Sequence, residues 1–248
     1  MQYDAVVLAG SDRESWLKEE GVDNKALLTI DGKPLVQYVL EALRGSRYHG
    51  RTILVADFPS NEALAPLVDV WVPAGDSLEE NIRRGAKKAT APLVLIVSSD
   101  LPFLETADVD LFCDFCLKNP AYYYIPVIRK EDIEARFPGS KRTYAQLKEG
   151  KVKAGNMVIF SIEAYDLVER FMSEVIGGRK KIWKLASIFG AKQILKFALG
   201  TLSIHELEAV SSHYIGKPGR AVILNAPAMG VDIDKPEDLI LARAILEK

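Results

Sequence analysis

The sequence contains few cysteines, few histidines and no large excess of charge of either sign. Of its 248 residues, two are Cys and three are His, and the formal net charge is −2. A near-neutral chain has no general basic field for nucleic acid or for an anionic membrane surface. No apolar run approaches the ~20 residues of a membrane-spanning helix, and no basic segment precedes a cleavable apolar stretch at the N-terminus. We therefore expect a cytoplasmic protein that binds neither nucleic acid nor membrane.

The two cysteines, Cys113 and Cys116, have the C-x-x-C spacing of redox and metal sites. A four-ligand zinc site would need a second pair, which the sequence lacks. The surrounding segment 108–119 has the period of an amphipathic helix, with both thiols on the same face as Val109 and Phe112. Because small thiols are common in protein cores, we predict that this pair is buried.

Short apolar runs rich in Val, Ile and Leu alternate along the chain with amphipathic segments. Most of these runs do not alternate apolar with polar residues, which is typical of parallel strands covered on both faces. The succession of strand and helix predicts an α/β protein, a three-layer α/β/α sandwich. The predicted strands are 5–10, 51–57, 68–73, 92–100, 122–128, 156–161 and 221–225, and the predicted helices are 34–46, 78–89, 108–119, 162–175 and 235–248.

The second half of the chain is less regular than the first. It holds a charged segment, 129–156, and a stretch of helical character, 179–202, which is basic at its start and apolar at its end. No internal repeat, low-complexity segment or Pro/Gly/Ser-rich linker divides the sequence. We expect a single domain over 1–248 with an insertion at roughly 129–220.

The first predicted strand ends abruptly in Gly10-Ser11-Asp12-Arg13. Ligands of open α/β sheets bind beyond the carboxyl ends of the strands. Gly10 permits close approach of the backbone, and backbone N–H groups, the Ser11 hydroxyl, the Arg13 guanidinium and the Lys25 ammonium all suit phosphate oxygens. The loop is neither a G-x-G-x-x-G fingerprint nor a P-loop, and a surface turn with scattered charges would have the same residues.

Two acidic positions follow later. Asp100 ends a predicted buried strand in "LIVSSDLPFL", where a carboxylate is costly unless it is paired, bound to a cation or capping the next helix. Mg²⁺ is typically bound by one or two such carboxylates together with substrate phosphates. In "GVDIDKPEDL" Asp234 is predicted to cap the last helix, with Glu237 as its capping-box partner and Pro236 in the first turn.

These segments together resemble the MobA-like nucleotidyltransferases, the group around the molybdenum-cofactor guanylyltransferases. The opening "VVLAGS…R…NKALLTIDGKPLVQYVLEAL" is similar to the family's N-terminus, "SSDLPF" to its D-x-P element and "GVDIDKPEDL" to its closing element. Two features depart from the pattern: Ser11 stands where the family has a second glycine, and the usual R-M-G is absent after Arg13.

The resemblance implies a Rossmann-like, mostly parallel mixed sheet of the nucleotide-diphospho-sugar transferase type. It also implies a Mg²⁺-dependent nucleotidyltransferase that joins the NMP part of an NTP to a phosphorylated acceptor and releases pyrophosphate. The implied catalytic residues are Lys25, Arg13 and Asp100. The implied nucleotide-binding residues are Leu8, Ala9, Gly10, Ser11, Lys25, Asn81 and Gly85, and the implied metal ligands are Asp100 and Asp232.

The predicted insertion would carry the acceptor. Asn156, Arg142 and Arg179 are the implied acceptor-binding residues, although the basic clusters around the two arginines could equally be a solvated surface or a lid. The segment that holds Asn81 and Gly85 could likewise be purely structural, with Asp76 or Ser77 capping a helix and Gly85 permitting close helix packing. Two other functions stay open: a nucleotide-sugar-dependent glycosyltransferase using the D-x-D at 232–234, and a non-catalytic nucleotide-binding protein. A monomer and a homodimer are equally compatible with the sequence.

Overall fold

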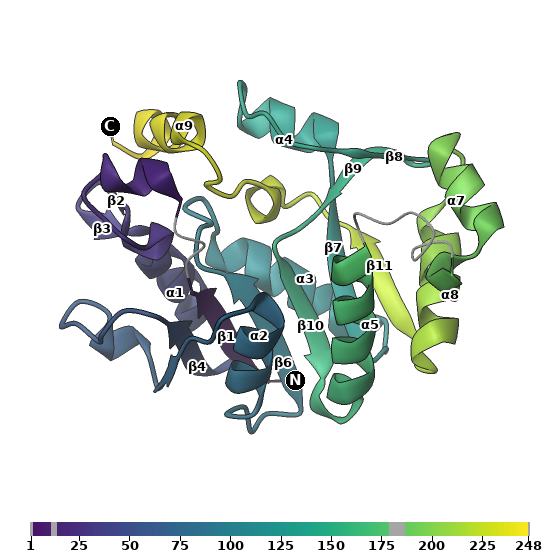
Figure 1. Ribbon diagram of the computed structural model, residues 1–248, viewed down its shortest axis with the longest axis horizontal. Coiled ribbons are helices and arrows are strands. Elements are labelled where there is room, and N and C mark those ends of the chain that lie inside the picture. Colours follow the sequence, from purple (N-terminus) through teal and green to yellow (C-terminus); the bar gives the residue numbers. More distant parts are fainter. Residues whose placement is uncertain (1, 11–13, 179–186, 248) are drawn as a thin grey trace.

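A computed structural model describes residues 2–10, 14–178 and 187–247 (Figure 1). Its centre is a nine-stranded mixed sheet with the strand order β5-β4-β1-β6-β10-β7-β9-β8, in which β11 also pairs with β7. The strands are β1 (Tyr3–Ala9), β4 (His49–Ala56), β5 (Val70–Pro73), β6 (Leu93–Ser98), β7 (Tyr123–Arg129), β8 (Ala145–Leu147), β9 (Gly150–Ala154), β10 (Met157–Ser161) and β11 (Gly219–Ile223). A separate hairpin joins β2 (Thr29–Ile30) to β3 (Lys33–Pro34).

Strands β5, β4, β1 and β6 pair in parallel, and β11 is parallel to β7. Strand β10 lies antiparallel between β6 and β7, and β8 and β9 are antiparallel. All seven strands predicted from apolar runs are present, and the α/β class and mostly parallel sheet are confirmed. Strands β2, β3, β8 and β9 were not predicted because they are short or charged, and β9 buries a single valine, Val152.

Helices cover both faces of the sheet. The residues of β1 alternate between two cores: Ala5 and Val7 pack with α1 (Leu35–Gly45) and α3 (Thr106–Lys118), whereas Val6 packs with α2 (Leu78–Ala86) and α5 (Tyr165–Gly178). In Figure 1, α2 and α5 lie in front of the sheet and α1 and α3 behind it. Other helices in the described part of the chain include α4 (Lys130–Arg136), α7 (Ala191–Ala198), α8 (Ile204–Ile215) and α9 (Pro236–Leu246).

Cys113 and Cys116 lie on the inner face of α3 as free thiols, and both are buried in the core beside Val109 and Phe112. Burial raises the pKa of Cys113 to about 12, which keeps the thiol protonated and unreactive. The prediction that the C-x-x-C pair is part of the core is confirmed.

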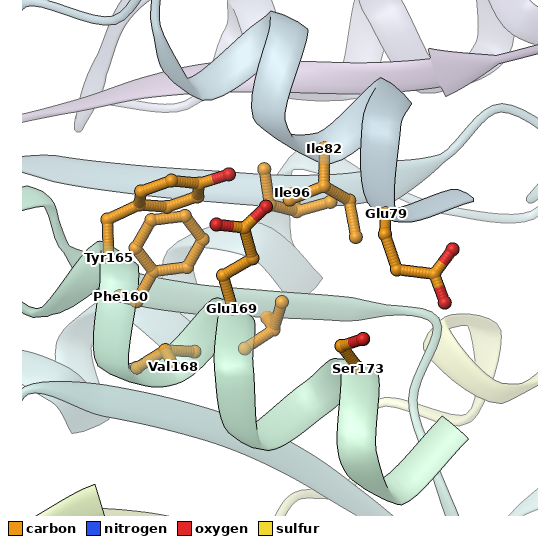
Figure 2. Close-up of a pocket in the computed structure, with 9 residues that line it drawn as sticks. Glu79, Ile82, Ile96, Phe160, Tyr165, Val168, Glu169 and Ser173 are labelled. Atoms are coloured by element: carbon orange, nitrogen blue, oxygen red, sulfur yellow. The ribbon is translucent and has the colours of Figure 1, made fainter. Parts of the chain in front are cut away.

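A small pocket lies between α2 and α5 (Figure 2). Its volume is about 40 Å³, and its floor is apolar, formed by Ile96 of β6, by Val158 and Phe160 of β10 and by Val168 of α5. None of its lining residues is a predicted site residue, so we treat it as a packing gap between two helices. Within the described residues, no helix has both the length and the apolarity needed to cross a membrane.

The region 129–220 contributes strands to the main sheet as well as peripheral elements. Strands β9 and β10 both pair antiparallel with β7 and are separated along the chain by Gly155 and Asn156. The Gly155 N–H donates to the carbonyl of Pro126, and the Asn156 N–H donates to the carbonyl of Met229. Helices α7 and α8 lie at the edge of the sheet, beside β8 and β11 (Figure 1). The break at Gly155 brings this region against the last part of the chain.

Candidate active site

Gly10 follows the carboxyl end of β1 and lies against Asn81 of α2. A Cβ atom at Gly10 would come within 2.7 Å of Asn81 Nδ2 and 3.3 Å of Ala74 Cβ, so any larger residue would displace the Asn81 amide. The Asn81 side chain is buried, and its Oδ1 accepts a 2.6 Å hydrogen bond from the N–H of Gly75. Leu8 and Ala9 precede Gly10 in β1, whereas Ser11 and Arg13 lie outside the described residues.

Asn24 fixes the backbone that carries Lys25. Its Oδ1 accepts from the N–H of Ala26 at 2.7 Å and caps the short 3-10 helix Lys25–Leu27. Its Nδ2 donates to the carbonyl of Ala9 at 2.7 Å and to the carboxylate of Asp57. The buried amide therefore ties this helix to the ends of β1 and β4. Sequence reasoning missed Asn24, although an asparagine before a short helical run is a typical N-cap.

Lys25 extends from this short helix to the carboxyl end of β6. Its Nζ lies 2.6 Å from Asp100 Oδ2 and 3.4 Å from Asp234 Oδ1. Burial lowers the pKa of Lys25, but the two carboxylates outweigh burial and raise the pKa above its ordinary value. Asp100 is itself buried, and its other oxygen accepts a hydrogen bond from the Ser98 hydroxyl. The structure thus brings together two of the residues predicted to be catalytic.

A cleft of about 170 Å³ opens between the ends of β1 and β6. The Gly10 backbone, Lys25 and Asp100 line it, together with Ser98 and Ser99. A larger cavity of about 790 Å³ adjoins it on the far side of residues 14–24 and reaches Asp57, Phe58 and Pro59. Glu14 and Asn24 line both cavities. An extended polar ligand could therefore lie across the end of β1.

Asp100 also belongs to a cluster of three carboxylates. Asp100, Asp232 and Asp234 each offer one oxygen, and these atoms lie within 4.8 Å of one another. Over residues 2–10, 14–178 and 187–247 this is the one such group of potential metal ligands. Hard divalent cations such as Mg²⁺ prefer oxygen ligands of this kind. The residues present therefore fit a divalent metal.

The predicted role of Asp234 as the cap of the last helix is wrong. Helix α9 begins one residue later, with Lys235 as its N-cap residue. The carboxylate of Asp238, not Glu237, accepts from the N–H groups of Asp234 and Lys235, at 3.0 Å each. The Asp234 side chain, 54% exposed, is thereby free of the helix and turns toward Lys25.

Asp232 is held more tightly than Asp234. Lys153 Nζ on β9 donates to Asp232 Oδ1 at 2.7 Å and to the carbonyl of Gly230 at 2.8 Å. Burial favours a higher pKa for Asp232, but Lys153 and Arg142 outweigh it and hold the pKa below its usual range. For Asp234, burial and the nearby Asp232 carboxylate raise the pKa, and Lys25 only partly offsets them. From the sequence, Lys153 was only one member of a basic cluster that could receive an anionic acceptor, and its contact with Asp232 was not predicted.

Of the other residues predicted for the site, one lies beside the cleft and the rest do not line it or are not described. Asn156 lies beside the cleft, because its carbonyl accepts from the N–H of Ser98 at 3.1 Å. Arg142 is buried against Asp232 and Asp238. Gly85 lies on the buried face of α2, where a Cβ would lie 2.2 Å from Val6 Cγ1 of β1, and it does not line the cleft. Arg179 lies outside the described residues.

Comparison with known proteins agrees with this geometry. A hypothetical transferase structure from Thermus thermophilus matches with a TM-score of 0.83 and 35% identity, over 96% of this chain and 100% of that one. The 2-C-methyl-D-erythritol 4-phosphate cytidylyltransferase of Thermus thermophilus matches with a TM-score of 0.59 and 18% identity, over the whole of both chains. A CMP:2-keto-3-deoxy-manno-octonic acid synthetase complexed with CTP matches with a TM-score of 0.61 and 16% identity, over 100% of this chain and 99% of that one.

The last two likenesses are at low identity and show that the fold is shared with nucleotidyltransferases. No curated protein matches the chain. The model of the MobA-like NTP transferase domain matches residues 5–188, which include Gly10, Lys25 and Asp100. The chain therefore belongs to the MobA-like NTP transferase family.

Proposed function

We propose that this nucleotidyltransferase is Mg²⁺-dependent, transfers the NMP part of an NTP to a phosphorylated acceptor and releases pyrophosphate. The observation that carries the proposal is the Lys25–Asp100 contact of 2.6 Å at the edge of the carboxylate cluster. This contact joins an ammonium group to a potential metal ligand in one cleft, directly beyond the end of β1 at Gly10. An ionised acceptor phosphate needs no general base, so positioning and charge neutralisation can supply the catalysis.

Each group around the cleft has a proposed role. The backbone of Leu8, Ala9 and Gly10 would face the nucleotide, with Ser11 and Arg13 extending that surface. Asn81, held in place by the Gly75 N–H, would meet the base or ribose. Lys25 would exchange its contact with Asp100 for the phosphate oxygens and neutralise the negative charge on the oxygens of the phosphate under attack. Gly85 would act through the packing of α2, which presents Asn81.

Asp100, Asp232 and Asp234 would hold the metal. When bound, Mg²⁺ would neutralise phosphate oxygens and polarise the phosphorus that is attacked. Asp234 was not among the ligands predicted from the sequence, but its exposed carboxylate has fewer competing partners than Asp232. The acceptor would approach from the side of Asn156 and the region 129–220, with Arg179 as a further contact for an anionic group. The chain would work on small molecules in the cytoplasm, as a monomer or a homodimer.

Thermal unfolding with ATP, CTP, GTP and UTP, each with and without Mg²⁺, tests the proposal. Saturation at about 100 times Kd stabilises a protein by ~2.7 kcal/mol, which is roughly 5–10 °C for a chain of this size. We expect one triphosphate to give this shift only with Mg²⁺, and Asp100→Ala to abolish it. Asp114→Ala is the matched control, since Asp114 pairs with Arg47 and Tyr48 away from the cleft.

Two results would contradict the proposal. Stabilisation by nucleotide sugars but by no triphosphate would favour a glycosyltransferase, for which the D-x-D arrangement of Asp232 and Asp234 is the relevant observation. Equal stabilisation with and without Mg²⁺, unaffected by Asp100→Ala, would instead favour a nucleotide-binding protein without metal-dependent turnover.

A further inference from the structure

Arg142 is a buried arginine at the back of the carboxylate cluster. Its side chain is only 3% exposed, and it comes from the segment between α4 and β8. Its Nε donates to the Ser140 hydroxyl at 3.1 Å, and its two terminal nitrogens face two different carboxylates. A guanidinium this deeply buried is not placed to receive a ligand from solvent, so its role must be found among its protein contacts.

The closer carboxylate is that of Asp238, in the first turn of α9. Arg142 Nη2 lies 2.9 Å from Asp238 Oδ1, and the ion pair is buried on both sides. The other oxygen, Asp238 Oδ2, accepts from the N–H groups of Asp234 and Lys235. Asp238 therefore links the guanidinium to the backbone that carries Asp234, one of the proposed metal ligands.

The second carboxylate is that of Asp232, whose Oδ1 lies 3.9 Å from Arg142 Nη1. The same oxygen accepts the hydrogen bond from Lys153. Ile233 lies between Asp232 and Asp234 in the sequence, and its N–H donates to the carbonyl of Asp100 at 3.1 Å. In Figure 1 the segment leading from β11 to α9 runs between α4 and the end of the sheet. Arg142 is thus the single side chain, among the described residues, that faces both Asp232 and Asp238.

Moving Arg142 toward an acceptor would leave two buried carboxylates without it, at a substantial desolvation cost. We propose that Arg142 is a positioning residue that locks residues 232–238 so that Asp232 and Asp234 face Asp100. The proposal deepens the proposed function and rests on its metal site. It also assigns Arg142 a role different from the acceptor contact expected from the sequence.

Binding of Mn²⁺ alone to the full chain, followed by water-proton relaxation, tests this proposal without needing the nucleotide or the acceptor. Removing a partner that orients metal ligands typically weakens metal affinity by about 10–100-fold. We expect that loss for Arg142→Met, and a smaller loss for Arg142→Lys, whose ammonium can reach one carboxylate but not both. Asp238→Asn should resemble Arg142→Met, because it removes the charge through which the guanidinium holds Asp234.

Arg51→Met is the matched control. Arg51 makes a comparable ion pair with the buried Asp4, 3.2 Å away, at the other end of β1. Its loss should lower the unfolding temperature but leave Mn²⁺ affinity at the wild-type value. If Arg142→Met does not fold, Arg142→Lys and Asp238→Asn carry the test.

The outcomes separate the two proposals. Wild-type Mn²⁺ affinity in the Arg142 and Asp238 variants would overturn the positioning role and restore the acceptor contact as the better explanation. If the wild type binds Mn²⁺ no more tightly than Asp100→Ala does, the metal site itself is wrong, and the role of Arg142 falls with it.

Discussion

The two halves of the site are built by different physical means. The N-terminal half, residues 8–10, 14–27 and 74–81, is fixed by side-chain amides bonded to nearby backbone, as in the contacts of Asn24 and Asn81. The C-terminal half, residues 140–156 and 230–238, is fixed largely by ion pairs between distant segments. Lys153 and Asp232, for example, are 79 residues apart in the sequence.

The N-terminal half therefore depends on backbone geometry, whereas the C-terminal half depends on the balance of charges. The side chains of Asn24 and Asn81 are uncharged, and they satisfy backbone groups near the end of β1. The C-terminal half gathers carboxylates that would repel one another without Lys153 and Arg142. We infer that the first half supplies shape for a nucleotide, and that the second supplies the negative charge that recruits a cation.

Lys25 is where the two halves meet, so its loss should have the largest effect. Lys25→Met removes the ammonium that contacts Asp100 and Asp234 while keeping much of the side-chain volume. Hydrogen bonds to charged groups contribute about 1.5–3 kcal/mol, so the affinity for the Mg²⁺–triphosphate should fall by about 10–150-fold. Titration calorimetry would measure it. Lys33→Met, which removes a surface pair with Glu41, is the control and should bind like wild type.

Asp4 is a buried carboxylate outside the site, so its contribution to the free energy of unfolding can be compared with that of the site carboxylates. Asp4 accepts from the backbone N–H groups of Arg51, Thr90 and Ala91. Burial favours a higher pKa, but these donors outweigh it and hold the pKa of Asp4 below its ordinary value of 3.8. Its contribution to stability is therefore complete above about pH 4 and is lost as the pH falls through the lowered pKa.

Asp4→Asn should accordingly destabilise the chain by about 1.5–3 kcal/mol at pH 7, since it removes a charged acceptor of several hydrogen bonds. It should also reduce the loss of stability as the pH falls below about 4. Urea unfolding at a series of pH values would measure both effects. An unchanged pH profile in the variant would show that the carboxylate is not ionised in the native state.

The sequence predicted correctly those parts of the fold that depend on residues close together in the chain. Apolar runs located the seven strands that had been predicted, and the ends of β1 and β6 located Gly10 and Asp100. Helices α4 and α8 and strands β8 and β9 were missed, because their faces are charged or mixed. Family resemblance, not periodicity, supplied Asp232 as a candidate and implied the catalytic role of Lys25.

The C-terminal half of the site was harder to predict because its geometry arises from pairing at long range. Nothing near Lys153 in the sequence indicates that its ammonium will meet Asp232. The start of α9 was placed one residue early, because Asp234, Pro236 and Glu237 satisfy the capping pattern. The N-cap residue, Lys235, has no side-chain acceptor, and Asp238 alone supplies the capping carboxylate. Arg142 was expected to be exposed to solvent or to an acceptor, but it is buried. The sequence around it is charged and contains no pattern that indicates a buried arginine.

The amide contacts of the N-terminal half can be broken at one residue. Asn24→Ala removes the cap of the Lys25–Leu27 helix and leaves the buried carbonyl of Ala9 without its donor. We expect a loss of about 1–3 kcal/mol in the free energy of unfolding. Nucleotide affinity should also fall, because the backbone of Lys25 loses its anchor. Asn61→Ala, which removes a similar amide contact to the Leu64 N–H in a surface loop, should cost less and leave nucleotide binding intact.

The smallest expected effect distinguishes packing from contact at Gly85. A methyl group there would meet Val6 and Val55 and push α2 off the sheet, whereas alanine in a helix is otherwise favoured over glycine by up to ~1 kcal/mol. Overpacking typically costs about 1–3 kcal/mol, so Gly85→Ala should lose about 1 kcal/mol on balance. If Gly85 acts only through packing, folded Gly85→Ala should lose less triphosphate affinity than Asn81→Ala. Asn81→Ala is the reference because it removes the side-chain amide that we expect to meet the base or ribose. A loss of affinity equal to that of Asn81→Ala, without loss of stability, would instead place the ligand against Gly85 and restore the nucleotide contact expected from the sequence.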